Sequence, residues 1–186
     1  MIEAGPAREG NAMFEIRAAA REEYPLALQF YDDLTDAMEG APYPPGWKKR
    51  VYPSEDFLKS SIACGELYLG WLDGSPAAAM VVNRAAAEGY EKAPWRVEAL
   101  PGQVAVLHAL GVLPCHQGRG LARRMVEYAA NFCRARGDRA LRLDVLASNL
   151  PAVRLYPGLG FWRVGTARLF YEDTGLTDFY LYEKAL

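Results

Sequence analysis

Apolar residues recur along the chain at the two spacings that distinguish helices from strands. From Glu22 to Met38 they fall every three to four positions, which predicts an amphipathic helix. A second helix is predicted between Ser54, a common N-cap residue, and Gly65, a residue that often ends helices. The same criteria predict two more helices, at Gly120–Arg136 and at Leu150–Tyr156 with Asn149 as its cap.

Short apolar or alternating runs predict the strands. Val104–Leu113 is almost wholly apolar, as expected of a central strand that is buried on both faces. A strand, the helix at 120–136 and the strand Ala140–Leu146 predict a right-handed crossover with two parallel strands. Around the hairpin signal Asp73-Gly74-Ser75 and near both ends of the chain, further strands are predicted at Phe14–Arg17, Glu66–Leu72, Ala77–Asn83, Phe161–Phe170 and Asp178–Tyr182.

This order of elements predicts an α/β (α+β) fold in a single domain over residues 1–186, with residues 1–12 as an irregular lead-in. The formal net charge is -2, which argues against a nucleic-acid partner. Three cysteines without a C-x-x-C pair and only two histidines predict free thiols and no structural metal. There is no apolar run long enough for a membrane span and no signal core, so we expect no membrane partner and a cytoplasmic protein.

Two segments are irregular and rich in aromatic residues. Gly40–Pro53 holds four prolines together with Tyr43, Trp47 and Tyr52, and Ala85–Gly102 holds Tyr90 and Trp95. Prolines at this density prevent regular structure. The aromatic side chains either form the wall of a binding pocket or cover the core.

The turn between the predicted central strand and the helix at 120–136 has the features of an anion site. Its glycines allow a ligand to approach the backbone, and the helix that follows offers unpaired N–H groups. Basic residues at this helix start are unusual, because the dipole favours acidic ones there, and a bound diphosphate would balance their charge. The alternative is a solvated basic turn. The residues in question are Gln117, Gly118, Arg119, Gly120, Leu121, Ala122, Arg123 and Arg124.

This turn resembles the GNAT superfamily of acetyl-CoA-dependent N-acetyltransferases, in which Q/R-x-x-G-x-G/A follows the fourth strand. Gln117, Gly120 and Ala122 match the pattern. A second similarity follows, with Asn149 and Ala152 in an N-x-x-A segment, then Leu155-Tyr156 and Gly160-Phe161. The resemblance implies a mixed, twisted sheet of about six or seven strands flanked by about four helices. It also implies an acetyl-CoA cleft between the splayed parallel strands Val104–Leu113 and Ala140–Leu146.

The resemblance further implies roles for individual residues. The coenzyme A pyrophosphate would lie on the backbone of Gln117–Arg123, and the pantetheine arm beside Leu110, Gly111 and Val112, where a glycine suits close approach. The Leu110 N–H would bond the thioester oxygen. Tyr156 would be the general acid and Asn149 would contact the pantetheine amide. Their alternative roles are packing for Tyr156 and helix capping for Asn149.

The base that accepts the amine proton is harder to assign. Neutralising an alkylammonium of pKa near 10.4 at pH 7 adds about 4.6 kcal/mol to the barrier unless a base removes the proton. Related enzymes often carry a glutamate just before the Leu110 position, where this chain has Ala109. The candidates are His108, Asp144 and Glu98. His108 alternatively satisfies a local hydrogen bond, and Asp144 alternatively pairs with Arg142 on one strand face.

These observations predict transfer of the acetyl group of acetyl-CoA to a primary amine of a small-molecule acceptor, in a partly apolar pocket formed by Gly40–Pro53, Ala85–Gly102 and the last hairpin. The near-neutral chain disfavours polyamine acceptors. The alternative is a non-catalytic sensor module that binds acyl-CoA, and a nucleotide-phosphate binder is weaker because no G-x-x-x-x-G-K-[ST] run is present. Aromatic residues in the last hairpin suggest a homodimer.

Overall fold

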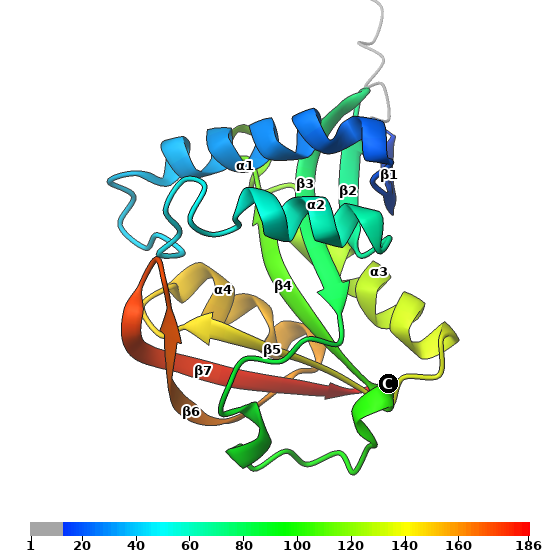
Figure 1. Ribbon diagram of the computed structural model, residues 1–186, viewed down its shortest axis with the longest axis vertical. Coiled ribbons are helices and arrows are strands. Elements are labelled where there is room, and N and C mark those ends of the chain that lie inside the picture. Colours follow the sequence, from blue (N-terminus) through cyan, green and yellow to red (C-terminus); the bar gives the residue numbers. More distant parts are fainter. Residues whose placement is uncertain (1–12) are drawn as a thin grey trace, which may run out of the picture.

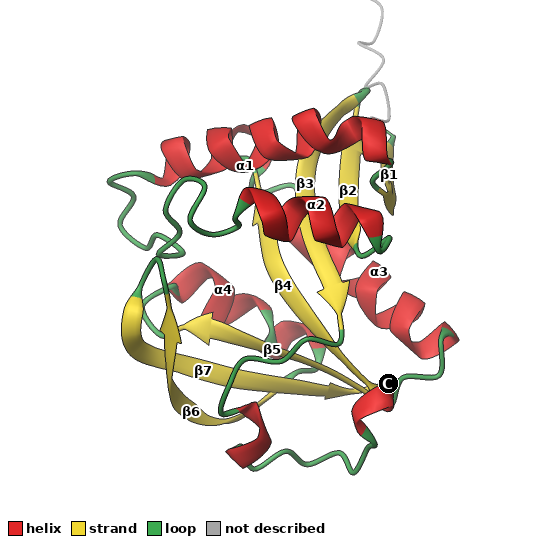
Figure 2. Cartoon of the chain, in the orientation of Figure 1, coloured by secondary structure: helices red, strands yellow, loops and turns green. Residues whose placement is uncertain are grey.

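The computed structural model describes residues 13–186, so the predicted lead-in at residues 1–12 lies outside the described residues. The described part is a seven-stranded mixed sheet flanked by four α-helices, which confirms the predicted fold class (Figures 1 and 2). In chain order the elements are β1 (Phe14–Ala18), α1 (Tyr24–Met38), α2 (Glu55–Ala63), β2 (Leu67–Leu72), β3 (Ser75–Asn83), β4 (Val104–Val112), α3 (Leu121–Ala135), β5 (Ala140–Leu146), α4 (Leu150–Leu155), β6 (Trp162–Tyr171) and β7 (Gly175–Ala185).

The helices cover both faces of the sheet. Along β2 and β3 successive side chains point to opposite faces, as a strand requires. Leu69 and Val81 pack with α1 and α2, whereas Tyr68, Met80 and Val82 pack with α3. Residues of α4 join the α3 side, so α1 and α2 lie on one face of the sheet and α3 and α4 on the other (Figure 1).

The strand order is β1-β2-β3-β4-β5-β7-β6, and the only parallel neighbours among the described strands are β4 and β5. These two strands pair only at their beginnings, where Val104–Val106 lie opposite Ala140–Arg142. Beyond that point they diverge, and β5 continues to pair with β7 as far as Leu146. The predicted splayed pair is therefore present, and the sheet opens at the carboxyl ends of β4 and β5.

A bulge interrupts β4 where the sheet opens. Gly111 lies opposite Ala79 and His108 opposite Val81, so β4 has one residue more than β3 over this interval. Ala109 takes a left-handed conformation (φ 50°), and its carbonyl accepts a hydrogen bond of 2.8 Å from the buried Tyr31 hydroxyl of α1. Helix α1 thus stabilises the distortion.

Several predicted details are corrected. The hairpin turn consists of Asp73 and Gly74 alone, both left-handed, and Ser75 already belongs to β3. Gly111 was expected to admit a ligand, but an added Cβ there would clash with Leu34 of α1. Its need for glycine therefore follows at least in part from helix packing.

The last two strands run further than predicted, to Tyr171 in β6 and from Gly175 in β7, and they form a long hairpin. Trp162, Phe170 and Leu176 on this hairpin are exposed. The homodimer suggested by these side chains stays a prediction. No helix within residues 13–186 has the length and apolar character needed to cross a membrane.

Candidate active site

The turn before α3 presents an open, uncapped helix start. Gly118 and Gly120 both have left-handed backbones (φ 75° and 74°), and no atom lies within 4 Å of a Cβ built on either residue. Gly120 is the N-cap and supplies no side-chain cap, and the first helical bond runs from the Arg124 N–H to the Gly120 carbonyl at 3.1 Å. The preceding N–H groups of the first turn therefore have no partner within the helix, as an anion site requires.

Two of the three arginines at this turn are already engaged. Arg124 donates to the Phe14 carbonyl at 3.0 Å and stacks on the Phe14 ring, so it holds β1 against α3 instead of facing the turn. Arg123 donates to the Gly158 carbonyl at 3.3 Å and pairs with Glu127. The expectation of unbalanced charge is therefore wrong for Arg123, which has an acidic partner, whereas Arg124 has no acidic partner among the described residues. Arg119 forms no ion pair with the described residues.

A cavity extends from this turn along the open edge of β4, and we call it the turn-side cavity. It lies between α1, the loop after α1 and α4. Predicted site residues gather here, namely Leu110, Gly111, Val112, Gln117, Ala122, Asn149 and Tyr156. Because β5 has diverged, this edge of β4 has no neighbouring strand at Leu110–Val112. The cavity and the turn are thus continuous along one edge of β4.

A second cavity lies on the other side of Leu110, and we call it the aspartate pocket. His108 and Asp144 face it from β4 and β5, and Asp173 faces it from the hairpin between β6 and β7. The two cavities meet, because six residues line both of them: Pro45, Trp47, Leu110, Asn149, Ala152 and Tyr156.

Asp144 is held by two tyrosine hydroxyls. The Tyr90 hydroxyl donates to Oδ1 at 2.5 Å and the Tyr171 hydroxyl donates to Oδ2 at 3.1 Å. Burial raises the pKa of the Asp144 carboxyl, and the hydroxyl bonds and the nearby His108 oppose this shift. The alternative pairing with Arg142 is wrong, since Arg142 binds the Glu183 carboxylate at 2.9 Å instead. Asp144 has no ion-pair partner within residues 13–186.

His108 is oriented by one hydrogen bond. Its Nε2 lies 2.9 Å from the Ala85 carbonyl oxygen, which confirms the local hydrogen bond that the sequence left open. A carbonyl only accepts, so the neutral ring carries its proton on Nε2 and leaves a lone pair on Nδ1. Burial lowers the pKa of His108, and the charge of Asp144 acts against this shift. The ring is therefore neutral at pH 7 and able to accept a proton.

Tyr156 and Asn149 lie where the cavities meet. The Asn149 side chain accepts a hydrogen bond from the Ala152 N–H at 3.3 Å, which confirms helix capping, the alternative role predicted for it. Asn149 also lines both cavities. The Tyr156 ring packs against Phe161 and Tyr182. Burial and, to a lesser extent, the Asp144 charge raise the pKa of its hydroxyl, so the group stays protonated.

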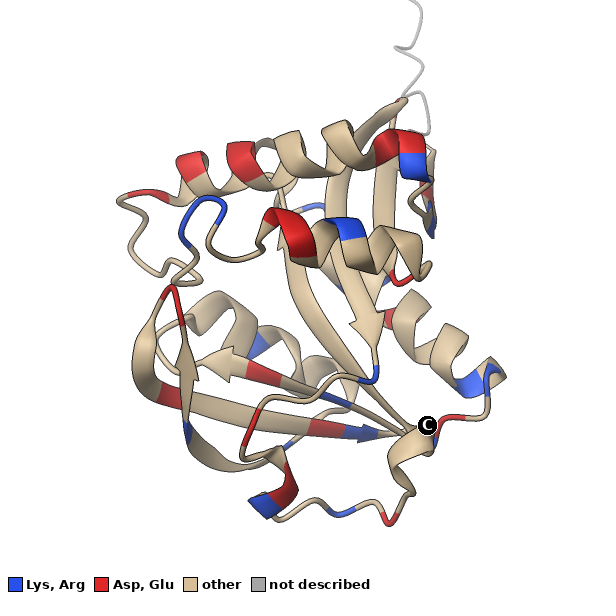
Figure 3. Ribbon diagram, viewed as in Figure 1, with Lys and Arg blue, Asp and Glu red and all other residues tan. Residues whose placement is uncertain are grey.

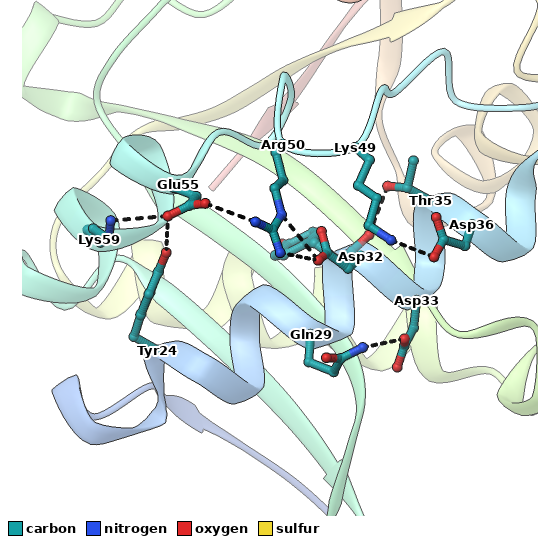
Figure 4. A network of polar contacts seen from close by, with 11 residues as sticks. Tyr24, Gln29, Asp32, Asp33, Thr35, Asp36, Lys49, Arg50, Glu55 and Lys59 are labelled. Carbon is teal, nitrogen blue, oxygen red and sulfur yellow. Dashed lines mark hydrogen bonds and ion pairs between the residues drawn. The ribbon is translucent and has the colours of Figure 1, made fainter.

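The irregular segment 40–53 forms one wall of the aspartate pocket, and forming a pocket wall was one of the two roles predicted for it. Trp47 and Tyr52 line the pocket. Ion pairs hold the segment on the helices, with Arg50 bound to Asp32 at 3.1 Å and Lys49 bound to Asp36 at 2.6 Å (Figure 4). The wall is thus fixed to α1.

Other parts of the predicted pocket are corrected. Tyr90 and Trp95 lie behind the pocket, where Tyr90 supports Asp144 and Trp95 stacks on Arg142. Tyr43 lines only the turn-side cavity, and Glu98 lines neither cavity. The prediction missed Tyr171, Asp173 and Thr174, because an acidic hairpin turn such as Glu172-Asp173-Thr174-Gly175 is common on protein surfaces.

Among residues 13–186 there is no group of three or more histidine, cysteine or acidic side chains that could hold a metal ion.

Solved structures of acetyltransferases share this fold. The model superposes on a GNAT-family acetyltransferase from Streptococcus agalactiae with a TM-score of 0.75 and 19% identity, over 95% of this chain and 99% of that chain. It also superposes on the ribosomal-protein-S18-alanine N-acetyltransferase from Escherichia coli with a TM-score of 0.64 and 22% identity, over 93% of this chain and 94% of that chain. At these identities the likeness shows the fold.

The family follows from the sequence. The model of the Acetyltransferase (GNAT) family matches residues 27–161, and the chain belongs to this family. Among curated proteins, it is 41% identical to the N-alpha-acetyltransferase RimI of Mycobacterium tuberculosis over 69 residues, or 37% of this chain and 42% of the relative. It is 38% identical to the streptothricin acetyltransferase of Streptomyces lavendulae over 63 residues, or 34% of this chain and 33% of the relative. These matches thus span less than half of each relative.

Proposed function

We propose that this protein is an N-acyltransferase that transfers the acetyl group of acetyl-CoA to the primary amine of a small molecule. The observation that carries the proposal is the meeting of two different cavities at Leu110, Asn149 and Tyr156. One cavity leads to an open helix start that suits a diphosphate, and the other contains a neutral histidine and a carboxylate.

The turn-side cavity is the donor site in this proposal. The N–H groups at the start of α3, with Gly118, Gly120 and Arg119, would hold the pyrophosphate. The free edge of β4 from Leu110 to Val112 would bind the pantetheine arm in the manner of an added strand. Bound acetyl-CoA would supply an activated thioester. The Leu110 N–H would polarise its carbonyl, because the bulge removes Leu110 from pairing with β3.

The aspartate pocket is the acceptor site. His108 Nδ1 would take a proton from the acceptor, and the Asp144 carboxylate would stabilise the cation formed on the ring. The amine nitrogen then forms a bond to the acyl carbon while the carbon–sulfur bond breaks. The Tyr156 hydroxyl would give its proton to the departing sulfur, and the second proton that the nitrogen loses as the amide forms would restore it. In this scheme His108 replaces the glutamate that is absent at Ala109.

The relatives support acetyl transfer to amines and leave the acceptor open. One is named as an enzyme acting on an alanine of ribosomal protein bS18, in Escherichia coli, and another on streptothricin. Since both match only part of the chain, the chemistry of the aspartate pocket is the better guide to the acceptor.

Calorimetric titration with acetyl-CoA tests the donor site. We expect binding by the native protein and a loss of about a hundredfold or more in affinity for Gly120→Glu, because a carboxylate would occupy the anion site and a side chain is strained at this backbone conformation. Gly102→Glu, at a glycine with open space around it and no left-handed backbone, is the matched control and should bind normally. No binding by the native protein would exclude the proposal.

Thiol release with a panel of primary amines tests catalysis. Release that depends on both substrates distinguishes an enzyme from the non-catalytic sensor. Tight acetyl-CoA binding without release, for every amine in the panel, would favour the sensor.

A further inference from the structure

The aspartate pocket carries more negative charge than the proposed reaction requires. Besides Asp144 it contains Asp173, whose residue is only 5% exposed. Asp173 Oδ1 accepts the Thr174 N–H at 2.8 Å, while neither of its carboxylate oxygens forms an ion pair within residues 13–186. Two acidic groups thus share one cavity whose lining holds no lysine or arginine. Burial raises the pKa of the Asp173 carboxyl, and the charge of the exposed Lys48, which forms no ion pair with it, acts against this shift.

The pocket also contains an unused hydrogen-bonding group. The Thr174 hydroxyl is buried beside the Asp173 carboxyl, toward which it can direct its proton, and its oxygen accepts no hydrogen bond from the described residues. A buried hydroxyl oxygen without a hydrogen-bond donor costs free energy, which a ligand that donates a hydrogen bond recovers. An ammonium group has three donors and a positive charge, so it satisfies both Thr174 and Asp173.

The two carboxylates reach the pocket from different elements and act on different tyrosines. Burial and then the Asp144 charge raise the pKa of Tyr156, and Asp173 is absent from the groups that act on this hydroxyl. Burial, followed by the charges of Asp144 and Asp173, raises the pKa of Tyr52, which lies in the wall between them. Asp144 on β5 thus acts on the Tyr156 hydroxyl at the junction of the cavities, whereas Asp173 lines the pocket from the turn between β6 and β7.

The remaining surface of the pocket suits an alkyl chain between two cations. Trp47, Tyr52, Tyr171 and Phe179 line it, and aromatic faces attract ammonium groups as well as methylene groups. A carboxylate on the acceptor would instead meet like charges in a site with low dielectric constant, which costs several kcal/mol.

Building on the proposed function, we propose that the acceptor is a short α,ω-diamine, with its reacting amine beside His108 and Asp144 and its second ammonium group bound by Asp173 and Thr174. The aromatic side chains hold the carbon chain between the two ends. The near-neutral net charge of the whole chain argued against such an acceptor, but a net charge does not reveal a local pair of carboxylates.

Thiol release with matched acceptors tests the proposal. Diaminopropane, diaminobutane and diaminopentane are each compared with the monoamine and the ω-amino acid of the same length. We expect the best diamine to exceed its monoamine by about tenfold or more in kcat/KM, since the second ammonium gains a partly buried ion pair. The amino acid should be the poorest of the three. Equal rates for diamine and monoamine, or a preference for an alanine-terminated peptide, would overturn the proposal.

Asp173→Asn identifies the residue responsible. It keeps the oxygen that accepts the Thr174 N–H and removes the charge, so the diamine advantage should fall close to one while the rate with monoamine is retained. Glu172→Gln is the matched control, because Glu172 is the exposed neighbour outside the pocket, and it should keep the advantage. An equal loss for diamine and monoamine in Asp173→Asn would contradict the assignment.

Direct binding separates this inference from the proposed function. Diamine binding is measured by calorimetry with free coenzyme A present, where no transfer occurs. One outcome is that no amine releases thiol, but the diamine binds and Asp173→Asn weakens diamine binding about tenfold. In that case the proposed acetyl transfer is wrong, and the assignment of the aspartate pocket as a diamine site stands. If monoamines and diamines react equally, the function stands and the diamine assignment is wrong.

Discussion

The two cavities that meet at Tyr156 are built in different ways. The turn-side cavity is also closed by α1 and the loop after it, but the features proposed to hold the donor are backbone features that follow one another along β4, the turn before α3 and the start of α4. The aspartate pocket depends on side chains from segments more than a hundred residues apart, from Trp47 to Phe179. A backbone site requires particular residues, such as left-handed glycines, and so leaves a continuous trace in the sequence. A site of converging side chains leaves isolated residues that look ordinary one at a time.

The cavities also differ in charge, although the chain as a whole is nearly neutral. Uncapped N–H groups and Arg119 make the turn attractive to anions, whereas the aspartate pocket has carboxylates and no basic lining residue. Acidic residues are visible on β5 and at the turn between β6 and β7, below the segment that follows α1, where the basic residues Lys49 and Arg50 are engaged with helix α1 (Figure 3). Each cavity thus has the sign of charge that complements one proposed substrate.

The substitution Asp144→Asn should have the largest effect on one cavity while leaving the other unchanged. We expect kcat/KM for the amine to fall about a hundred- to a thousandfold, because the acceptor loses a half-buried charge partner, while the affinity for acetyl-CoA stays within about twofold. Steady-state kinetics and calorimetry measure the two quantities. Asp178→Asn, an exposed carboxylate on β7, is the control and should behave as the native protein. A parallel loss of acetyl-CoA affinity would show that the cavities are not independent.

Tyr156→Phe tests the junction itself. We expect kcat to fall about ten- to a hundredfold with KM unchanged, since a thiol of pKa near 8.5 leaves fairly well without assistance. The raised pKa of the Tyr156 hydroxyl also makes it a reluctant donor. Tyr128→Phe, on α3 and outside both cavities, is the control. An unchanged kcat would leave Tyr156 a packing role only.

The elements and the turn-side cavity were largely predictable from the sequence. Alternation and helical spacing are local properties, and Gly118 and Gly120 are needed for a backbone that other residues rarely adopt. The bulge in β4 was not predictable, because its left-handed residue is Ala109, and the Tyr31 hydroxyl that holds its carbonyl comes from a helix far away in the sequence.

The aspartate pocket was predictable only in part. His108 and Asp144 were candidates because their inferred positions lie near the place of the glutamate that is absent at Ala109. Asp173 was missed since its role depends on where the β6–β7 hairpin folds, which no local pattern specifies. Arg124 was predicted to contribute to the anion site, but it binds Phe14 instead. This contact could not be predicted, because the two residues lie 110 positions apart in the sequence.

The pH dependence of catalysis distinguishes the cavities with a smaller effect. The pKa of His108 is lowered, so the ring is neutral above an unusually low pH and loses its lone pair as the pH falls. The pKa of Asp144 is raised, so this carboxylate also loses its charge as the pH falls. The polar groups facing Asp144 from the surrounding elements are His108, Tyr52, Tyr90, Tyr156 and Tyr171.

We therefore expect the pH profile of kcat/KM to have an acid limb, in which kcat/KM falls about tenfold for each pH unit. The midpoint of this limb should lie below the usual histidine pKa of about 6.5. The ratio of the native protein to His108→Asn removes the titration of the acceptor amine, which both proteins share. The limb should persist in this ratio, and acetyl-CoA affinity should show no such limb. A ratio that is constant with pH would exclude His108 as the base.

Tyr31→Phe probes the feature that the two cavities share, and here the expected effect is on stability. The buried Tyr31 hydroxyl holds the Ala109 carbonyl at 2.8 Å, and removing it leaves that carbonyl unpaired, at a cost of about 1–3 kcal/mol in the free energy of unfolding. Denaturant unfolding measures the loss. Tyr24→Phe, which removes a more exposed hydroxyl bond to Glu55, should cost less than half as much. Because His108 and Leu110 flank Ala109, a relaxed bulge moves the proposed base and the oxygen-binding N–H together. A loss of kcat in Tyr31→Phe with both KM values unchanged would show that α1 positions the reacting ends of both substrates through this one hydrogen bond, whereas a loss of stability alone would confine its role to the fold.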